Sequence, residues 1–237
     1  MGYSGHAYAG WAAQPGQVSV QSVLEGALAE ALGHPARGTA ASRTDAGVHA
    51  DAQVVSFETS SSIPPRGLVR ALVNSLPADI WPIDAEEVAA EFDARRSARR
   101  RWYRYVLWRG AAPSSLWRGR CLPVPDALDL SAMRRAAGAL LGRHDFAALA
   151  AEPPSERSTV RTVYAADWLV RGQLASFEIC ADGFLTHMVR CIVGTLLWVG
   201  RGRWSAEQFR SALESLDRRA AGPNAPAIGL TLSRIEY

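Results

Sequence analysis

The segment Arg43-Thr-Asp-Ala-Gly-Val-His49 brings a cation, a carboxylate and an imidazole together within a short stretch of chain. Arg43 stands two residues before Asp45, and a nearby guanidinium favours the ionised carboxylate that a nucleophile or an electrostatic stabiliser needs. The same residues suit an ordinary turn, in which Asp45 accepts a hydrogen bond from its own backbone and Gly47 supplies a positive φ. From these residues alone, both interpretations stay open.

The elements on either side of this segment are predicted from the spacing of apolar residues. Residues recurring at helical spacing predict a helix from Val20 to Leu32, which Gly33 ends. Residues 53–57 read as a short strand. The segment therefore lies in a loop between regular elements, which is where proteins often display reactive side chains.

The remaining chain mixes helices and strands, with a proline-rich stretch at residues 111–125 as the expected boundary between two halves, 1–110 and 111–237. We predict an α+β fold of two similar halves, with mixed, mainly antiparallel sheets packed together and helices on the outer face. The other predicted helices are at 65–76, 130–141 and 186–199 and after the capping box Ser205-Ala-Glu-Gln208, and the other strands are at 101–108, 160–170, 174–180 and 230–237.

The bulk composition is that of a globular, intracellular protein. Apolar residues make up 48% of 237, which is too many for a disordered chain. The longest apolar stretch, Ile192–Val199, is short for a membrane span, and residues 1–6 show no signal peptide. Three cysteines at unrelated spacings suit a reducing compartment. We therefore expect a cytoplasmic protein.

All 26 basic residues are arginine, and nine of them lie between residues 94 and 120, where there is no acidic residue. Arginine binds phosphates through two donors at once and stacks on bases. An arginine strip with interleaved aromatic residues therefore suits a nucleic-acid surface, although an ordinary solvated face has a similar composition. The strip comprises Arg95, Arg96, Arg99, Arg100, Arg101, Arg104, Arg109, Arg118 and Arg120, with Trp102, Tyr103, Tyr105, Trp108 and Trp117 among them.

Neither a cofactor nor a metal is expected. Gly200-Arg-Gly202 lacks the third glycine and the preceding strand of a dinucleotide-binding motif. Cys180, His187 and Cys191 do not have the spacing of zinc ligands, and we expect them to lie among core residues.

Arg43-Thr-Asp-Ala-Gly-Val-His49 is similar to the signature of the TruA family of tRNA pseudouridine synthases, and further similarities follow in order along almost the whole chain. They are Tyr3-Ser-Gly5, Tyr8-Ala-Gly-Trp11, Val20-Gln21, Asn74-Ser-Leu-Pro77, Asp79-Ile80, Phe92-Asp-Ala-Arg95, Tyr103-Arg-Tyr105, His144-Asp-Phe146, Thr159-Val-Arg-Thr162, Met188-Val-Arg190, Ile192-Val-Gly194, Ala225-Pro226 and Gly229-Leu230.

This resemblance implies an isomerase that converts uridine into pseudouridine in the anticodon stem-loop of tRNA, at positions 38, 39 and 40. The bond from ribose C1′ to uracil N1 is broken and a bond from C1′ to C5 is formed, so no cofactor or metal is required. The target base must be flipped out of its stem before the enzyme can reach it. The resemblance also implies a homodimer that binds tRNA mainly through shape and phosphates.

The resemblance assigns roles residue by residue. It makes Asp45 the essential carboxylate of the first half, with Arg43 paired to it, while the second half completes the cleft and supplies dimer contacts. Tyr103 matches an active-site tyrosine that stacks on the base, and Leu230 an apolar residue against the uracil; read alone, both suit an ordinary core. For His49 we expect a structural or RNA-contact role. The candidate RNA-binding arginines are Arg95, Arg99, Arg101, Arg104 and Arg190.

Two departures from the family pattern stand out. Only Met1 and Gly2 precede Tyr3-Ser-Gly5, where the family has a full strand and an aspartate in place of Ser4, so we expect the first strand to be missing. Ser42 replaces the glycine that usually precedes the arginine. Two rival functions are a non-catalytic RNA-binding protein and a glycosidase, but a glycosidase normally needs two carboxylates and the nearest second acid is Asp51.

Overall fold

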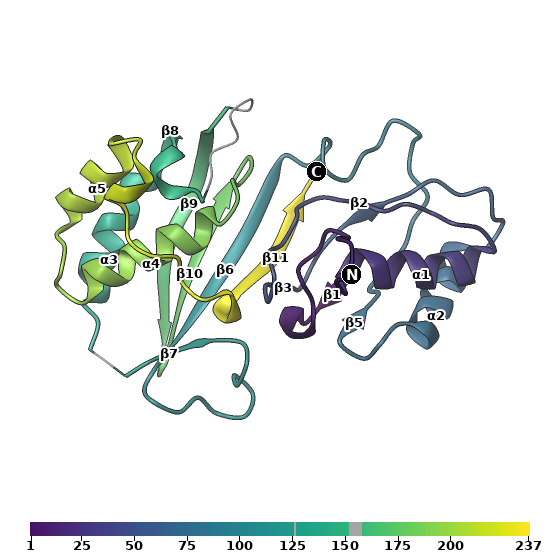
Figure 1. Cartoon of the computed structure of the whole chain (residues 1–237), viewed down its shortest axis with the longest axis horizontal. Coiled ribbons are helices and arrows are strands. Elements are labelled where there is room, and N and C mark those ends of the chain that lie inside the picture. The colour runs from purple at the N-terminus through teal and green to yellow at the C-terminus, as the bar shows by residue number, and fades with distance from the viewer. Residues whose placement is uncertain (126, 152–157) are drawn as a thin grey trace. The chain divides into compact units, whose positions relative to one another are not determined.

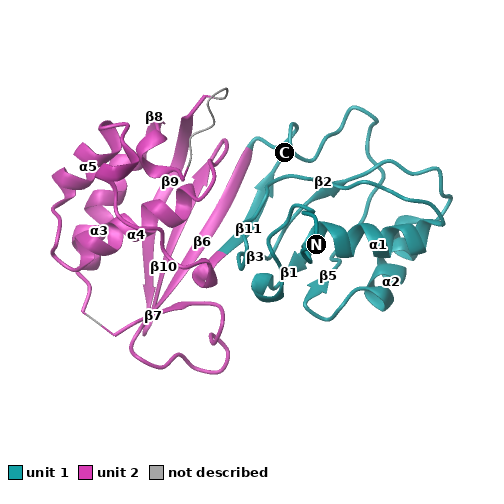
Figure 2. Ribbon diagram, viewed as in Figure 1, with its two compact units in different colours: residues 1–99, 231–237 teal, residues 100–230 magenta. Residues whose placement is uncertain are grey.

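The computed structural model describes residues 1–125, 127–151 and 158–237 as an α+β protein (Figure 1). The chain divides into two compact units: unit 1 comprises residues 1–99 and 231–237, and unit 2 comprises residues 100–230 (Figure 2). The C-terminal strand thus belongs with the N-terminal part of the chain. The functional roles given to the predicted halves 1–110 and 111–237 stay predictions.

Unit 1 is built from very short strands. Strands β1 (Gly2–Tyr3), β3 (His49–Ala50) and β5 (Ile80–Trp81) pair in antiparallel fashion, with β1 in the middle, and β3 also pairs in parallel with β11 (Leu230–Glu236). Strands β2 (Thr39–Ala40) and β4 (Val55–Ser56) form a separate antiparallel pair. A short first strand is therefore present where we expected none: β1 has only two residues, of which Tyr3 pairs with both neighbours and Gly2 with β5.

Two contacting helices complete unit 1, α1 (Val20–Leu32) and α2 (Pro65–Ser75). Both lie where the sequence predicts them. Ser19 accepts a hydrogen bond from the Ser22 amide and so caps the first turn of α1, and Gly33 ends the helix with a left-handed φ of 77°. The predicted strand at 53–57 is shortened to β4. The Val54 carbonyl still accepts from the Ala41 amide, whereas the Gln53 backbone amide bonds to the Met1 carbonyl and the Gln53 side chain bonds to the Ser42 carbonyl.

Unit 2 contains an antiparallel sheet of long strands. Strand β10 (Leu174–Ala181) lies between β6 (Arg100–Arg109) and β9 (Val160–Arg171), and β9 also pairs with β8 (Gly142–Asp145). Strand β7 (Leu122–Val124) pairs in parallel with β6, inside the stretch predicted as a linker. The mainly antiparallel character predicted for the sheets is confirmed.

Helices α3 (Leu130–Ala137), α4 (Met188–Gly200) and α5 (Ala206–Glu214) gather beside this sheet (Figure 2). Helix α4 is buried along almost its whole length, which explains its apolar sequence without a membrane. No helix among the described residues is long and apolar enough to span a bilayer. The capping box predicted at Ser205 is present, since its hydroxyl accepts from the Gln208 amide and the Gln208 side chain accepts from the Ser205 amide.

Candidate active site

Asp45 lies on a tight turn between β2 and β3. The Asp45 carbonyl accepts a hydrogen bond from the Val48 amide at 3.1 Å, and Gly47 has a φ of 77°. A carbonyl bonded three residues ahead, with a glycine of positive φ at the third position, is the pattern of a type II turn. The glycine predicted to supply a positive φ therefore does so. The turn leaves the Asp45 side chain partly exposed, so forming a turn and presenting a carboxylate are compatible.

Two glycines of the opening loop lie against the backbone of this turn. A Cβ on Gly10 would come within 2.7 Å of the Thr44 carbonyl oxygen and 3.0 Å of the Ala46 nitrogen. A Cβ on Gly5 would overlap the Val48 carbonyl oxygen. Backbone can approach backbone this closely only where no side chain intervenes. The motif glycines thus let the opening loop pack directly on both sides of Asp45.

Hydrogen bonds from buried side chains hold the residues before Asp45. The Tyr3 hydroxyl and Thr44 Oγ1 are 2.7 Å apart. The side-chain Nε2 of Gln53 donates to the Ser42 carbonyl at 2.7 Å and to the Tyr3 hydroxyl at 3.3 Å. The Thr44 carbonyl accepts from the Trp11 amide at 2.9 Å. Ser42 does not have a positive φ, so the serine that replaces the usual glycine causes no backbone strain here.

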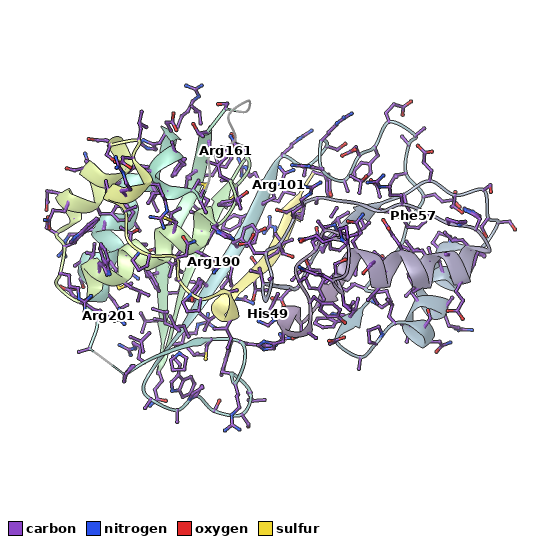
Figure 3. The ribbon with its side chains drawn as sticks, viewed as in Figure 1. His49, Phe57, Arg101, Arg161, Arg190 and Arg201 are labelled. Atoms are coloured by element: carbon purple, nitrogen blue, oxygen red, sulfur yellow. The ribbon has the colours of Figure 1, made fainter. Side chains whose placement is uncertain are left out.

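His49 is buried, with 1% of its surface exposed, at the start of β3 (Figure 3). Its Nδ1 accepts a hydrogen bond from the Gly5 amide at 3.2 Å, and its ring is nearly perpendicular to the His6 ring at a centroid distance of 4.9 Å. An Nδ1 that accepts from a backbone amide carries no proton, which fixes the tautomer of the neutral ring. These contacts favour the structural role expected for His49; its predicted RNA contact stays a prediction.

Arg43 is exposed and lines an open hollow of about 1110 Å³ on unit 1. Three more arginines, Arg37, Arg95 and Arg96, line the same hollow. The carboxylates of its two acidic residues accept hydrogen bonds from backbone amides. Glu25 accepts from the Gly38 amide at 2.9 Å, and Asp93 accepts from the amides of Arg95 and Arg96 at 2.8 and 2.7 Å. The bonds from these two amides, that of Arg96 first, hold the pKa of Asp93 below its ordinary value.

In unit 2, the predicted site residue Tyr103 lies on β6, opposite Ile179 of β10. Its ring is buried, with 5% of the residue exposed, and meets the Phe184 ring edge-on at a centroid distance of 5.0 Å. Tyr105 lies on the same side of the strand and is anchored, because its hydroxyl donates to the Pro226 carbonyl at 2.7 Å. The alternation predicted for 101–108 is thus confirmed for its tyrosine-bearing side. The predicted contact of Tyr103 with a uracil stays a prediction.

The other unit 2 candidates differ in accessibility. Arg101 is only 8% exposed, and its guanidinium donates to the Asp182 carbonyl at 2.7 Å (Figure 3). Arg104 is partly buried on the opposite side of β6. Arg190, on α4, donates from Nε to the Ala225 carbonyl at 2.9 Å, and Leu230 is buried. The arginine strip is therefore not a uniform solvent-exposed surface, since part of it supports the fold.

Known proteins resemble the chain over its full length. Residues 136–237 match a family model described as tRNA pseudouridine synthase. A tRNA pseudouridine synthase A from Pelobacter propionicus is 43% identical over 235 residues, covering 99% of this chain and 96% of its own length. Those from Moorella thermoacetica and Nitrosomonas europaea are 43% and 42% identical, covering 100% and 99% of this chain and 97% and 86% of their own length.

This chain belongs to the tRNA pseudouridine synthase family. The resemblance seen in the sequence motifs is thereby confirmed, and with it the class of enzyme, an isomerase that acts on uridine in tRNA. Among the described residues of this synthase, no group of three His, Cys, Asp or Glu side chains is arranged to hold a metal ion. Its three cysteines, Cys121, Cys180 and Cys191, are buried as thiols.

The sequence patterns do not predict the residues that support the synthase's aspartate turn. They indicate Gln53 only as the start of a strand and Thr44 only as part of the motif. The available signal was a glutamine beside the apolar pair Val54 and Val55. A buried polar side chain needs hydrogen-bond partners, so a glutamine next to a buried segment indicates a network even when its partners cannot be named.

Proposed function

We propose that this protein isomerises uridine to pseudouridine in the anticodon stem-loop of tRNA, with Asp45 as its essential carboxylate. The observation that carries the proposal is the way Asp45 is displayed. It lies on a turn that is fixed on both sides by backbone contacts and buried side chains, while its own side chain stays partly exposed. Such preorganisation is what a reacting group requires, since small misplacements reduce rates strongly.

The reaction balances without any external reagent. The glycosidic bond from C1′ to N1 breaks, a carbon–carbon bond from C1′ to C5 forms, C5 loses its proton and N1 gains one. A carboxylate serves this sequence as a nucleophile or by assisting formation of a glycal-like intermediate, and in each case it must be ionised and within reach of the flipped nucleotide.

For the other candidate residues we propose the roles that follow from the family motifs. Arg43 stabilises Asp45 and the flipped state, Tyr103 stacks on the base, and Leu230 packs against the uracil. The burial of Tyr103 and its edge contact with Phe184 support a rigid aromatic platform. The hydrogen bonds that anchor Arg101 and Arg190 support a role in shaping the protein around the substrate.

The exposed arginines of unit 1 are proposed to bind RNA phosphates. Arg95 and Arg99 are exposed, and Arg95 shares the hollow with Arg37, Arg43 and Arg96. Four arginines and the two carboxylates of Glu25 and Asp93 line this hollow, so its net charge is positive. Arginine-rich surfaces of this kind recognise RNA through its backbone rather than its sequence.

We also propose that the protein is a cytoplasmic homodimer. Its buried thiols suit a reducing compartment, and the dimer follows from the family resemblance. Light scattering coupled to size-exclusion chromatography measures the mass directly. Twice 25.6 kDa is the expected value, and a mass of one chain at micromolar concentration contradicts the dimer.

The catalytic assignment is tested by tritium release from a tRNA transcript labelled at uridine C5. Asp45→Asn keeps the size of the side chain and removes its charge, so the rate should fall by roughly a thousandfold or more. Asp51→Asn, in the same segment, is the matched control and should stay within about twofold, since small polar changes away from the reacting groups have minor effects. Wild-type protein that binds tRNA without releasing tritium is a non-catalytic RNA-binding protein; an active Asp45→Asn variant refutes the role of Asp45.

The RNA surface is tested by the salt dependence of tRNA binding. Replacing both Arg95 and Arg99 by glutamine should weaken binding at low salt. The slope of log K against log salt should fall by about one for each phosphate that these side chains no longer neutralise. Arg171→Gln, an exposed arginine at the end of β9, is the control and should leave the slope unchanged. Identical slopes for all three proteins would exclude the two unit 1 arginines from the RNA interface.

A further inference from the structure

We propose that Tyr3, Thr44 and Gln53 are positioning residues that set the catalytic geometry of Asp45 through one buried chain of hydrogen bonds. The inference rests on the proposed function of Asp45 and adds three residues to it. None of the three touches the substrate in this proposal. Their task is to fix the backbone of the residues that precede Asp45 in the turn.

Gln53 holds Ser42 by both of its backbone groups. The Ser42 amide donates to Gln53 Oε1 at 3.3 Å, and Gln53 Nε2 donates to the Ser42 carbonyl at 2.7 Å. One residue earlier, the Ala41 amide still bonds to the backbone carbonyl of Val54 at 2.9 Å. At Ser42, the side-chain carboxamide of Gln53 takes the place of such a backbone partner. Reversing the carboxamide would set donor against donor and acceptor against acceptor, so its orientation is fixed.

The fixed carboxamide of Gln53 also bonds to the next side chain of the network. Gln53 Nε2 has two protons, and its second one goes to the Tyr3 hydroxyl oxygen at 3.3 Å. The same hydroxyl lies 2.7 Å from Thr44 Oγ1, and either hydroxyl can donate this bond. Buried hydrogen bonds therefore connect Gln53 through Tyr3 to Thr44.

The three side chains are buried, so losing one of their hydrogen bonds carries a large energetic cost. Tyr3, Gln53 and Thr44 are 0%, 1% and 6% exposed. A polar group buried at this depth cannot exchange its protein partner for water, so a broken bond leaves a buried donor or acceptor unsatisfied. Burial raises the pKa of Tyr3 to about 12. The tyrosine therefore keeps its proton at neutral and mildly alkaline pH.

Thr44 connects this chain of bonds to the catalytic residue. It directly precedes Asp45, its Oγ1 bonds to Tyr3, and its carbonyl accepts from the Trp11 amide at 2.9 Å. A β-branched side chain has few rotamers, so fixing Oγ1 also restricts the backbone from which Asp45 extends. On the other side, the turn to Val48 holds the Asp45 carbonyl. The Tyr3 bond thus restrains the residue next to Asp45 on its N-terminal side.

The decisive comparison is Thr44→Val with Thr44→Ser. Valine keeps the shape of threonine without its hydroxyl, and serine keeps the hydroxyl. Under single-turnover conditions we expect Thr44→Val to lower the rate of tritium release by about 10- to 100-fold, with unchanged tRNA affinity, because displacing a reacting group affects the chemical step. Thr44→Ser should recover most of the rate. A Thr44→Val variant within about twofold of wild type, or one whose defect lies wholly in tRNA affinity, overturns the proposal.

A second comparison tests whether Tyr3 and Thr44 act through the same bond. Tyr3→Phe removes the other hydroxyl of the pair and should lower the single-turnover rate to a similar degree across neutral and mildly alkaline pH, leaving the shape of the pH profile unchanged. The double variant Tyr3→Phe, Thr44→Val should be no slower than the slower single variant, because both changes remove one interaction. Effects that multiply, or a changed pH profile, contradict a shared positioning role.

Backbone hydrogen exchange separates this proposal from the proposed function. Measured well below the unfolding temperature, exchange in the segment 42–48 should be about tenfold faster in Thr44→Val than in wild type, with α1 and β10 unchanged. If wild-type protein releases no tritium, the proposed function fails, and exchange alone decides whether the bonds hold the turn. If exchange in 42–48 does not change, the positioning proposal fails even for an active enzyme.

Discussion

The two units are stabilised in different ways. In unit 2, β6 and β10 align along the whole length of β10, and buried α4 lies in the same unit. In unit 1, each of the strands β1 to β5 has only two residues, and many segments are held by side chains that bond to backbone, such as Gln53, Glu25 and Asp93. A long ladder is specified by repeated backbone pairing, whereas the unit 1 loops depend on individual residues.

This difference indicates where mutations should affect stability and where they should affect function. Unit 2 should lose stability when its packing is disturbed, since much of its backbone lies in regular ladders and helices. Unit 1 carries Asp45 on a turn, so small displacements of its supports should reduce activity before they unfold the protein. Substitutions of glycine test the contrast well, because each adds a single methyl group.

The largest effect is expected for Gly194→Ala in α4. A Cβ at this position would overlap the Pro223 carbonyl oxygen, so the helix and the loop around residue 223 must separate. Overpacking of a rigid backbone contact costs about 3 kcal/mol, which corresponds to a fall in Tm of roughly 6–12 °C for a protein of this size. Calorimetry measures this fall in Tm. Gly138→Ala, where an added Cβ meets nothing within 4 Å, is the control, and equal Tm values for the two variants would contradict a rigid contact at α4.

Gly5→Ala should affect activity more than stability. The added methyl overlaps the Val48 carbonyl oxygen and displaces the turn that carries Asp45. We expect the rate of tritium release to fall by about 100-fold and the free energy of unfolding to fall by about 1–2 kcal/mol. Kinetics and urea denaturation on the same preparation give both values. A loss of stability as large as that of Gly194→Ala, with normal activity in the folded fraction, would remove the contrast between the units.

Alkaline pH should weaken unit 1 through Tyr3. Its folded pKa of about 12 lies above the ordinary value of 10.0 because burial disfavours the phenolate. The unfolded chain therefore loses this proton first, so the stability contribution is complete below the ordinary pKa and disappears as the pH rises through the folded pKa. At a pH one unit above the ordinary pKa, the contribution of Tyr3 lowers the free energy of unfolding by about 1 kcal/mol. Urea denaturation across this alkaline range should show a smaller decline in the free energy of unfolding for Tyr3→Phe than for wild type. Equal declines in the two proteins would contradict a contribution from Tyr3.

The smallest effect is expected for Gly26→Ala in α1, and it should be an increase in stability rather than a loss. A Cβ there meets nothing within 4 Å. Alanine is a better helix former than glycine and reduces the entropy of the unfolded chain, so stability, measured by urea denaturation, should rise by about 0.5–1 kcal/mol. Activity should stay at the wild-type level, since the added methyl does not overlap the turn. A destabilised Gly26→Ala variant would mean that added methyl groups harm unit 1 for reasons other than overlap.

The sequence by itself determined most of the helices, the long strands and the family. Apolar spacing located α1, α2 and α4 because a helix face repeats every few residues, and the motif around Asp45 with its companions along the chain identified a pseudouridine synthase. Asp45 was found in the same way, as a residue type within a recognisable local pattern.

Only the tertiary structure decided what supports that pattern. Tyr3, Thr44 and Gln53 are separated by up to 50 residues, and Arg101 turns its guanidinium to Asp182 across 81 residues. The short strands of unit 1, including the unexpected β1, likewise depend on partners distant in the chain. Periodicity reports local conformation, but a buried hydrogen bond depends on where two distant segments meet, and no local signal encodes that meeting.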